Sequence, residues 1–287
     1  MNNNFNKMME EILSNMDKMD DGIDFGNKLE EIGNIYDFDK FEKEIELEEK
    51  ANYYLEKAEN AKTVKTAIKY AKKAYETSPK CFEAVILLSE LETNIDKKIK
   101  ILDDGLTKEK KRLIKEGYYC KDNIGKFFSI FETRDYIIGM FTKIDYLINN
   151  NNYKDAIKLA KDIIRLNSDD NMGARYYLIA IYSYLNKKEE MLKIYKKYNE
   201  ESLELLFPIF IYYFNKKEYK KANTYFEIIK KENPYIIDYF KGTIKNNSSI
   251  PNGSYIIGDP SEVIMYFEHF NFLIDDNPNI KEYINNK

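Results

Sequence analysis

The chain has 287 residues, of which 44% are hydrophobic and 33% charged, with only 11 Gly and 6 Pro. This composition supports a sizeable hydrophobic core and excludes a disordered tail, a collagen-like chain and a loop-rich all-β sandwich. The 45 basic residues nearly balance 49 acidic ones, so nucleic acid is not an expected partner, and one His with two Cys leaves too few ligands for a dedicated zinc site.

The N-terminal segment carries an amphipathic helical pattern. Its apolar residues share one face: Phe5, Met8, Met9, Ile12, Leu13 and Met16. Two roles stay open for this Met-rich face, which could cap the end of a helical array or dock a partner. Residues 17–45 are acidic and contain three Gly. Residues 1–45 are therefore predicted to be an amphipathic helix followed by an acidic linker.

No targeting or membrane segment is apparent. The first fifty residues are rich in acids and contain no apolar stretch of signal-peptide length. Elsewhere the sequence has no apolar run of the roughly 18 residues that a spanning helix needs. We therefore expect a cytoplasmic protein without a membrane partner, and the abundance of Asn, Ile, Lys and Tyr is typical of an AT-rich bacterial genome.

A repeated spacing of small and apolar residues organises the middle of the chain. Three sets share it: Ala67, Ala71, Ala74 and Pro79; Ala156, Ala160, Ile163 and Ser168; Ala222, Phe226, Ile229 and Pro234. The 66 residues from Ala156 to Ala222 fit two units of about 33, near the period of tetratricopeptide (TPR) repeats. Small residues four and three apart allow antiparallel helices to approach closely, and Pro ends the second helix of each hairpin.

The periodicity predicts an all-α fold. Residues 46–240 are expected to form a right-handed α-solenoid of TPR-like helical hairpins. The period is stretched before Ala156, so an insertion at about residues 107–128 must lengthen a helix or form a loop. Residues 241–287 are predicted to be a loop and a C-terminal capping helix over residues 261–274.

Three stretches go beyond generic repeats. Residues 123–136 contain Gly125 and Glu-Thr-Arg, residues 166–178 contain Asp-Asn and Gly-x-Arg-Tyr, and residues 255–266 contain Tyr-x-x-Gly followed by Glu and Tyr. Together they resemble a group of bacterial tetratricopeptide repeat proteins that is distantly similar to the suppressor of tumorigenicity 7 family. The chain departs from the group at Lys126, Phe128, Asp135 and Ser168, where His, Trp, Pro and Pro are usual. The resemblance implies a helical repeat protein and carries over no catalytic residue.

The resemblance directs attention to one set of candidate partner-binding residues: Asn123, Glu132, Arg134, Asp170, Asn171, Arg175 and Tyr176. Arg134 and Arg175 have two interpretations, since they could tie adjacent hairpins together or grip an acidic group of a partner. Asp170 and Asn171 could cap the next helix, and the oxygens that a calcium loop needs at further offsets are missing. Gly173 is expected to permit a close approach at that helix start.

Other features give weaker indications of chemistry. His269 lies among aromatic residues without a nucleophile near it in sequence, and Gly253 and Gly258 do not form a phosphate-binding motif. Residues 108–112 and 216–221 are rich in Lys beside acids and are expected to be solvated faces.

The sequence thus favours a non-catalytic interaction scaffold. It is expected to need no metal and no cofactor, and to bind a peptide or helix of a partner protein on the concave face of the solenoid. A peptide-sensing regulator, or an enzyme that uses Glu132 and Arg134, is the alternative.

Overall fold

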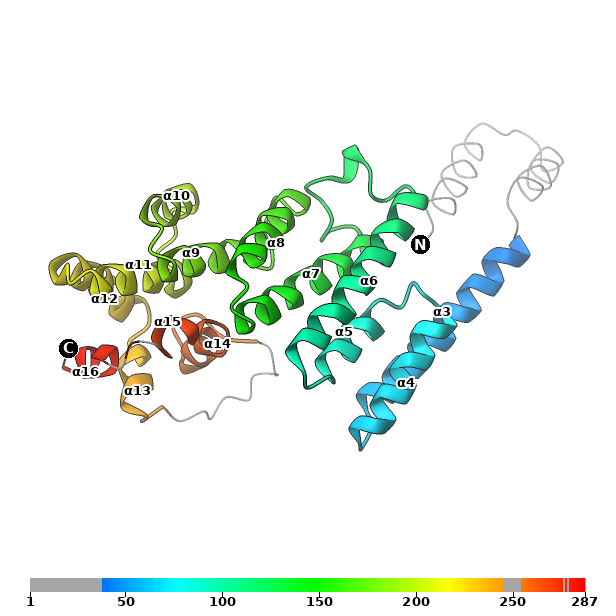
Figure 1. The fold of residues 1–287 in the computed structure, drawn as a ribbon, viewed down its shortest axis with the longest axis horizontal. Helices are drawn as coiled ribbons and strands as arrows, with labels where there is room; N and C mark the ends of the chain where they lie inside the picture. Colours follow the sequence, from blue (N-terminus) through cyan, green and yellow to red (C-terminus); the bar gives the residue numbers. More distant parts are fainter. Residues whose placement is uncertain (1–37, 245–253, 276, 278, 287) are drawn as a thin grey trace, which may run out of the picture. The chain divides into compact units, whose positions relative to one another are not determined.

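The computed structural model describes residues 38–244, 254–275, 277 and 279–286. These residues form helices joined by short loops and contain no β-strand, which confirms the all-α prediction for this part of the chain (Figure 1). The amphipathic segment at residues 5–16 lies outside the described residues. None of the described helices is long and apolar enough to cross a membrane.

The helices follow one another closely along the chain. Their bounds are α3 Phe38–Glu59, α4 Val64–Thr77, α5 Glu83–Glu90, α6 Ile95–Lys115, η1 (a 3-10 turn) Lys121–Asn123, α7 Phe131–Asn149, α8 Tyr153–Leu166, α9 Ala174–Tyr184, α10 Lys188–Tyr198, α11 Leu203–Asn215, α12 Tyr219–Glu232, α13 Tyr235–Lys241, α14 Pro260–Phe270, α15 Phe272–Asp275 and α16 Asn279–Asn285. Residues 38–45, expected in the acidic linker, belong to α3, because Glu and Lys are good helix formers and the last Gly of that region is Gly33.

The chain divides into two compact units. Unit 1 contains the described residues up to Asn152 together with Asp162–Asn171, and unit 2 contains Tyr153–Lys161 and the described residues from Met172 onward. The boundary between the units passes through α8. Each unit is considered by itself below.

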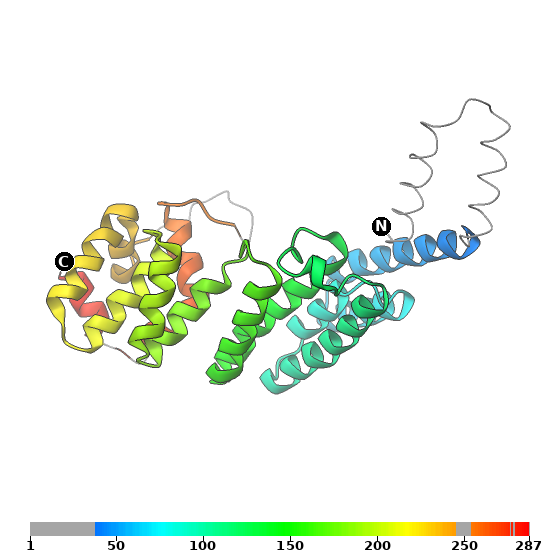
Figure 2. The same cartoon turned by 90° about the horizontal axis from the view of Figure 1, so that it is seen from above.

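Unit 1 is a series of antiparallel helices in which α3 packs on α4, α4 on α5, α5 on α6 and α6 on α7 (Figures 1 and 2). The small residues of α4 are buried as the spacing predicts, and Ala74 packs in one cluster with Leu55 of α3 and Ala84 of α5. Thr63 caps the start of α4, since its hydroxyl accepts the N–H of Thr66 at 3.2 Å. Side chains of methyl size therefore allow the first two hairpins to pack closely.

The core of unit 1 closes around the ring of Phe82. This ring is 0% exposed and lies against α6 and α7 where each carries a Gly. A Cβ atom on Gly139 would lie 2.6 Å from Cε1 of Phe82, and one on Gly105 would lie 3.2 Å from Cε2 of the same ring. Neither distance is a normal carbon contact, so both helices can approach the ring only because these residues have no side chain.

The insertion both extends a helix and forms a loop. Helix α6 continues to Lys115, and the chain then loops through η1 to the start of α7. The loop is fastened by the segment after α8, because the N–H groups of Gly125 and Phe127 both donate to the carbonyl of Leu166 at 3.0 Å. The N–H of Ser168 donates back to the carbonyl of Gly125 at 2.9 Å. The first stretch that carries the family resemblance therefore lies beside the beginning of the second, Leu166 to Ser168, in unit 1.

Unit 2 repeats the antiparallel arrangement with α9 against α10 and α11, and α11 against α12. The predicted seam of α12 is buried at Ala222, Phe226 and Ile229. Helix α14 packs on α11 and α13 with its aromatic face. Its ring of Phe267 lies 5.1 Å from Phe207 of α11, and its ring of Phe270 lies 4.9 Å from Tyr177 of α9. In unit 2 the apolar face of α9 and α11 is thus covered by α14.

Candidate functional site

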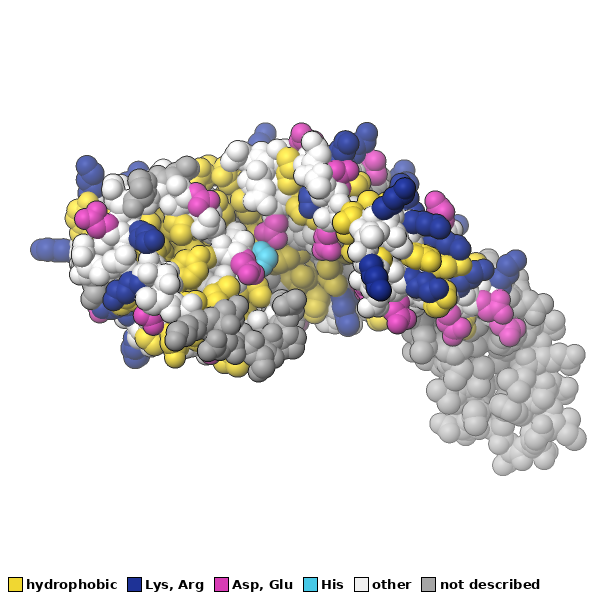
Figure 3. Space-filling view, turned by 90° about the horizontal axis from the view of Figure 1, so that it is seen from below, with side chains coloured by type: hydrophobic (Ala, Val, Ile, Leu, Met, Phe, Trp, Pro, Cys, Tyr) yellow, Lys and Arg dark blue, Asp and Glu magenta, His cyan; other side chains and the backbone are white. Residues whose placement is uncertain are grey.

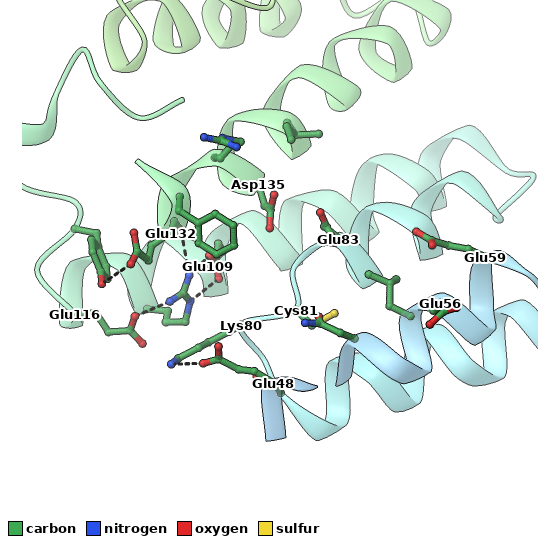
Figure 4. Close-up of a pocket in the computed structure, with 18 residues that line it drawn as sticks. Glu48, Glu56, Glu59, Lys80, Cys81, Glu83, Glu109, Glu116, Glu132 and Asp135 are labelled. Carbon is green, nitrogen blue, oxygen red and sulfur yellow. Dashed lines mark hydrogen bonds and ion pairs between the residues drawn. The ribbon is translucent and has the colours of Figure 1, made fainter. Parts of the chain in front are cut away.

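A pocket of about 500 Å³ opens in unit 1 (Figure 4). It is lined by α3, by the connection from α4 to α5, by the last turns of α6 and by the first turns of α7. Its charged side chains are predominantly acidic: Glu48, Glu56, Glu59, Glu83, Glu109, Glu116, Glu132 and Asp135 face Lys80, Arg112 and Arg134. Four elements that are distant in the sequence therefore bring eight carboxyl groups and three cations to one hollow.

One side of the pocket is an ordered set of ion pairs. The Arg112 guanidinium donates to both carboxylate oxygens of Glu109, at 2.9 and 2.5 Å, and to Glu116 at 2.5 Å. Burial alone would lower the pKa of Arg112, but the hydrogen bonds that it donates to Glu109 raise it. Lys80 donates to Glu48 at 2.6 Å and to Glu44 at 3.2 Å. These two cations are therefore balanced by carboxylates of the protein itself.

The ion pairs correct one expectation from the sequence. Residues 108–112 were expected to be a solvated face, yet Glu109 is 3% exposed and Arg112 16%. Arg112 lies three residues after Glu109 and four before Glu116, the residue that caps α6, so the three side chains share one helix face. That face lines the pocket. Only the Lys residues of this run remain exposed.

The other side of the pocket carries uncompensated acids. Figure 4 shows Asp135 of α7 near Glu83 of α5, and within the described residues neither carboxylate has an ion pair or a side-chain hydrogen bond. Burial raises the pKa of Asp135 to about 6, and the neighbouring carboxylates of Glu83 and Glu109 add to the effect. Burial also raises the pKa of the Cys81 thiol to about 11, so this sulfur is a poor nucleophile.

Two of the candidate residues from the sequence line this pocket. Glu132 accepts the Tyr118 hydroxyl at 3.0 Å, and Arg134 donates from Nε to the carbonyl of Phe128 at 2.9 Å. A third candidate, Asn123, supports the same loop by donating from Nδ2 to the carbonyl of Tyr118 at 2.9 Å. The loop of the insertion, where it joins the first turn of α7, therefore forms one edge of the pocket.

The remaining candidates lie elsewhere. Asp170 is buried and Asn171 exposed in the segment of unit 1 that follows α8. In unit 2, Arg175 donates to Glu200 at 3.2 Å, and the hydroxyl of Tyr176 donates to the same carboxylate at 3.1 Å. The guanidinium of Arg175 also lies 4.1 Å from the centre of the Tyr176 ring. Arg175 and Tyr176 thus connect the start of α9 with the loop after α10.

The close approach expected at Gly173 is confirmed. Its φ is +74°, and a Cβ atom there would lie 2.5 Å from Cδ2 of Tyr176. We expect Gly173→Ala to lower the free energy of unfolding by about 2–4 kcal/mol, since Ala adds both backbone strain and a steric clash. Urea denaturation followed by circular dichroism would measure the loss.

Gly242 supplies the matched control for this substitution. Its φ is +70°, but no atom lies within 4 Å of the position of an added Cβ. Gly242→Ala should therefore show only the backbone contribution, about 1 kcal/mol. Equal losses for the two variants would show that the Tyr176 ring moves aside without cost.

The third stretch of the family resemblance also lies in unit 2, at the start of α14. Glu262 is buried and accepts the N–H of Gly258 and the Nδ2 of Asn233, each at 2.7 Å. The Tyr255 hydroxyl donates to Glu204 at 3.2 Å, and burial raises the pKa of that carboxyl. These contacts anchor the segment before α14 to the rest of unit 2.

The sequence analysis missed the acids that give the pocket its character. Glu83 and Asp135 come from different helices, and no spacing in the sequence indicates that α5 and α7 bring them together. Asp135 was noted only as a departure from the Pro usual in the similar group. One usable signal was the spacing of Glu109, Arg112 and Glu116, because residues three and four apart on a helix are neighbours. This spacing predicts that Arg112 is ion-paired.

Comparison with protein-family models and with curated proteins gives no match. No protein-family model matches the chain, and no curated protein matches it. The fold therefore defines the class on its own, as an all-α protein of antiparallel helices with an acidic pocket among the described residues of unit 1. The similarity to bacterial tetratricopeptide proteins stays a prediction. In the described parts of the chain, no group of three or more His, Cys, Asp or Glu side chains is arranged to hold a metal ion.

Proposed function

We propose that this is a non-catalytic, cytoplasmic interaction scaffold of TPR-like helical hairpins, and that it binds a peptide or helix of a partner protein in the pocket of unit 1. The pocket carries the proposal. It is lined by α3 and α7, which are first helices of successive hairpins, together with the connection from α4 to the start of α5 and the last turns of α6. First helices line the concave binding surface in stacks of helical hairpins.

The contrast between the two units supports this choice of site. In unit 2 the corresponding helices α9 and α11 are covered by α14, with rings of Phe207 and Phe267 in contact. In unit 1 the first helices leave a hollow of about 500 Å³, which is within the range of ligand-binding sites.

An exposed aromatic ring marks the edge of the pocket. Phe131, the first residue of α7, is 74% exposed while lining the pocket. An exposed Phe next to a hollow is typical of a binding anchor, because aromatic side chains contribute most of the energy at many interfaces.

The anchor can be tested with selected peptides. Phage-displayed random 12-residue peptides would be selected against the full chain, and the affinity of the enriched peptides would be measured by isothermal titration calorimetry. Phe131→Ser should weaken binding at least tenfold, since the ring would no longer be buried by the peptide. The stability of the protein should not change, because the ring is exposed in the free protein.

Val64→Ser is the matched control. Val64 is also an exposed apolar residue at the first position of a helix, 58% exposed on α4, and does not line the pocket. Its substitution should leave peptide affinity unchanged. The proposed function would be wrong if no peptide were enriched over selections without protein, or if both variants lost affinity equally.

One observation favours the enzyme alternative, although through a different residue from the one expected. A carboxyl group in a pocket with its pKa at about 6, as in Asp135, is suited to acid–base chemistry near neutral pH. Glu132 and Arg134 are less suited, because the first accepts a Tyr hydroxyl and the second is held by a backbone carbonyl. Turnover of a small molecule that Asp135→Asn abolishes would establish this alternative.

A further inference from the structure

We infer that the partner segment is basic, and that the cation of one of its Lys or Arg side chains docks beside Asp135 and Glu83 in the pocket of unit 1. This inference rests on the proposed function and adds the chemistry of the partner.

The argument starts from the charge balance of the pocket. Lys80 and Arg112 are each held by two carboxylates of the protein, so they offer little to an acidic partner. The Nε of Arg134 is directed to the carbonyl of Phe128. The carboxylates of Asp135 and Glu83 have no such counter-ion among the described residues. The charge that the pocket lacks is therefore positive.

Partial burial of Asp135 strengthens its interaction with an incoming cation. Asp135 is half-buried, and a cation placed beside a partly desolvated carboxylate gains more than one placed beside a carboxylate in open water. The groups that face Asp135 are Glu83 from α5, Glu109 and Arg112 from α6, Arg134 from α7 itself and Cys81 from the α4 to α5 connection. Of the two carboxylates, Glu109 is already paired with Arg112, so Glu83 is the one that an incoming cation would also satisfy.

The apolar lining fits the stem of a basic side chain. Leu55, Ile138 and Phe131 line the pocket together with the acids. A Lys or Arg side chain buries its methylene groups on apolar surface while its charged end reaches a polar group. A small inorganic cation would leave this apolar surface unused, so a side chain of a peptide suits the pocket better.

A second copy of the chain is another source of a basic surface. The test must distinguish it from a basic segment of a partner protein. Lys and Arg side chains gather over α4 in Figure 3, where Lys65, Lys69, Lys72 and Lys73 are exposed on its outer face. Sedimentation velocity over a range of concentrations separates the two sources. Dimers that Asp135→Asn dissociates would assign the pocket to a second copy and overturn the inference.

The main experiment compares peptides that differ only in charge. The peptides selected against the full chain should be enriched in Lys and Arg relative to the unselected library. For the tightest peptide, replacing the key Lys with acetyl-lysine should weaken binding at least tenfold, as should Asp135→Asn in the protein. With the acetylated peptide, Asp135→Asn should have little further effect, because each change removes the same ion pair.

The same variant gives a second readout that a structural role would not produce. Since the raised pKa of Asp135 means that its charge opposes folding, Asp135→Asn should increase the melting temperature at pH 7.5 while it weakens peptide binding. Asp104→Asn, at an exposed position of α6 outside the pocket, removes the same charge from the same unit and should change neither property.

The outcomes separate the inference from the proposed function. Selected peptides that are neutral or acidic, yet still depend on Phe131, would overturn the inference and leave the function standing. Binding of spermidine that depends on Asp135, with no peptide enriched, would assign the pocket to a small amine and overturn both. Basic peptides whose affinity is unchanged in Asp135→Asn would also overturn the inference.

Discussion

Phe82→Ala should lower the free energy of unfolding by about 3–5 kcal/mol, the range for a fully buried Phe. The ring is 0% exposed and is enclosed by α6 and α7, whose Gly105 and Gly139 allow contact at backbone distance. Gly105 and Gly139 have no side chain that could move into the cavity left by Ala. Urea denaturation of the full chain would measure the loss.

A substitution on the facing helix tests the same contact from the other side. Gly139→Ala places a methyl group 2.6 Å from the Phe82 ring and should cost about 1–3 kcal/mol by overpacking. In the double variant Phe82→Leu with Gly139→Ala, the smaller side chain makes room for the new methyl group. Its loss should therefore be smaller than the sum of the two single losses, and strictly additive losses would show that the contact does not limit packing.

Phe131→Ala is the control for loss of an aromatic ring. Phe131 is 74% exposed, so its truncation should change stability by less than about 0.5 kcal/mol. The two Phe residues have the same chemistry and differ in burial alone.

The sequence was most informative where structure depends on local spacing. Ala67, Ala71 and Ala74 lie on one helix face at intervals fixed by the helix itself, and all three are buried as predicted. The insertion was found because it breaks the period, and it is accommodated by the longer α6 and by the loop that residue Gly125 joins to α8. Such features need no knowledge of which distant residues meet.

The features that the sequence did not reveal depend on contacts between distant segments. In the sequence, Gly105 and Gly139 appear only as residues that destabilise a helix. The structure shows that both make room for the Phe82 ring. Similarly, Glu83 and Asp135 are separated by more than one hairpin, and each alone resembles an ordinary surface acid. Packing and charge balance are properties of the assembled unit, so spacing within one helix cannot predict them.

Arg112→Met should be about as destabilising as the loss of a large core side chain. The substitution keeps the aliphatic bulk of residue 112 but leaves the carboxylate of Glu109, which is only 3% exposed, without its cation. Removing one partner of a buried ion pair costs about 3–5 kcal/mol, because the remaining charge stays desolvated. Urea denaturation at pH 7.5 would measure this loss.

The double variant and the pH dependence identify the cause. Glu109→Gln combined with Arg112→Met removes both charges and should recover most of the stability. In Arg112→Met alone, the cost arises from a desolvated negative charge, and protonation of a buried carboxylate removes that cost. The deficit of this variant should therefore shrink as the pH falls from 7.5 to 5. A deficit that is constant with pH would point to lost packing of the Arg side chain instead.

An exposed ion pair provides the comparison that separates burial from charge. Lys221 and Glu218 form a contact of 2.5 Å with the same three-residue spacing as Glu109 and Arg112, yet their side chains are 57% and 39% exposed. Lys221→Met removes a cation of equal charge and should leave stability unchanged, because water solvates the remaining carboxylate. Equal losses of stability in Arg112→Met and Lys221→Met would show that the loss of charge, and not burial, causes the destabilisation. Desolvation would then give the acids of the pocket in unit 1 no added attraction for a basic side chain.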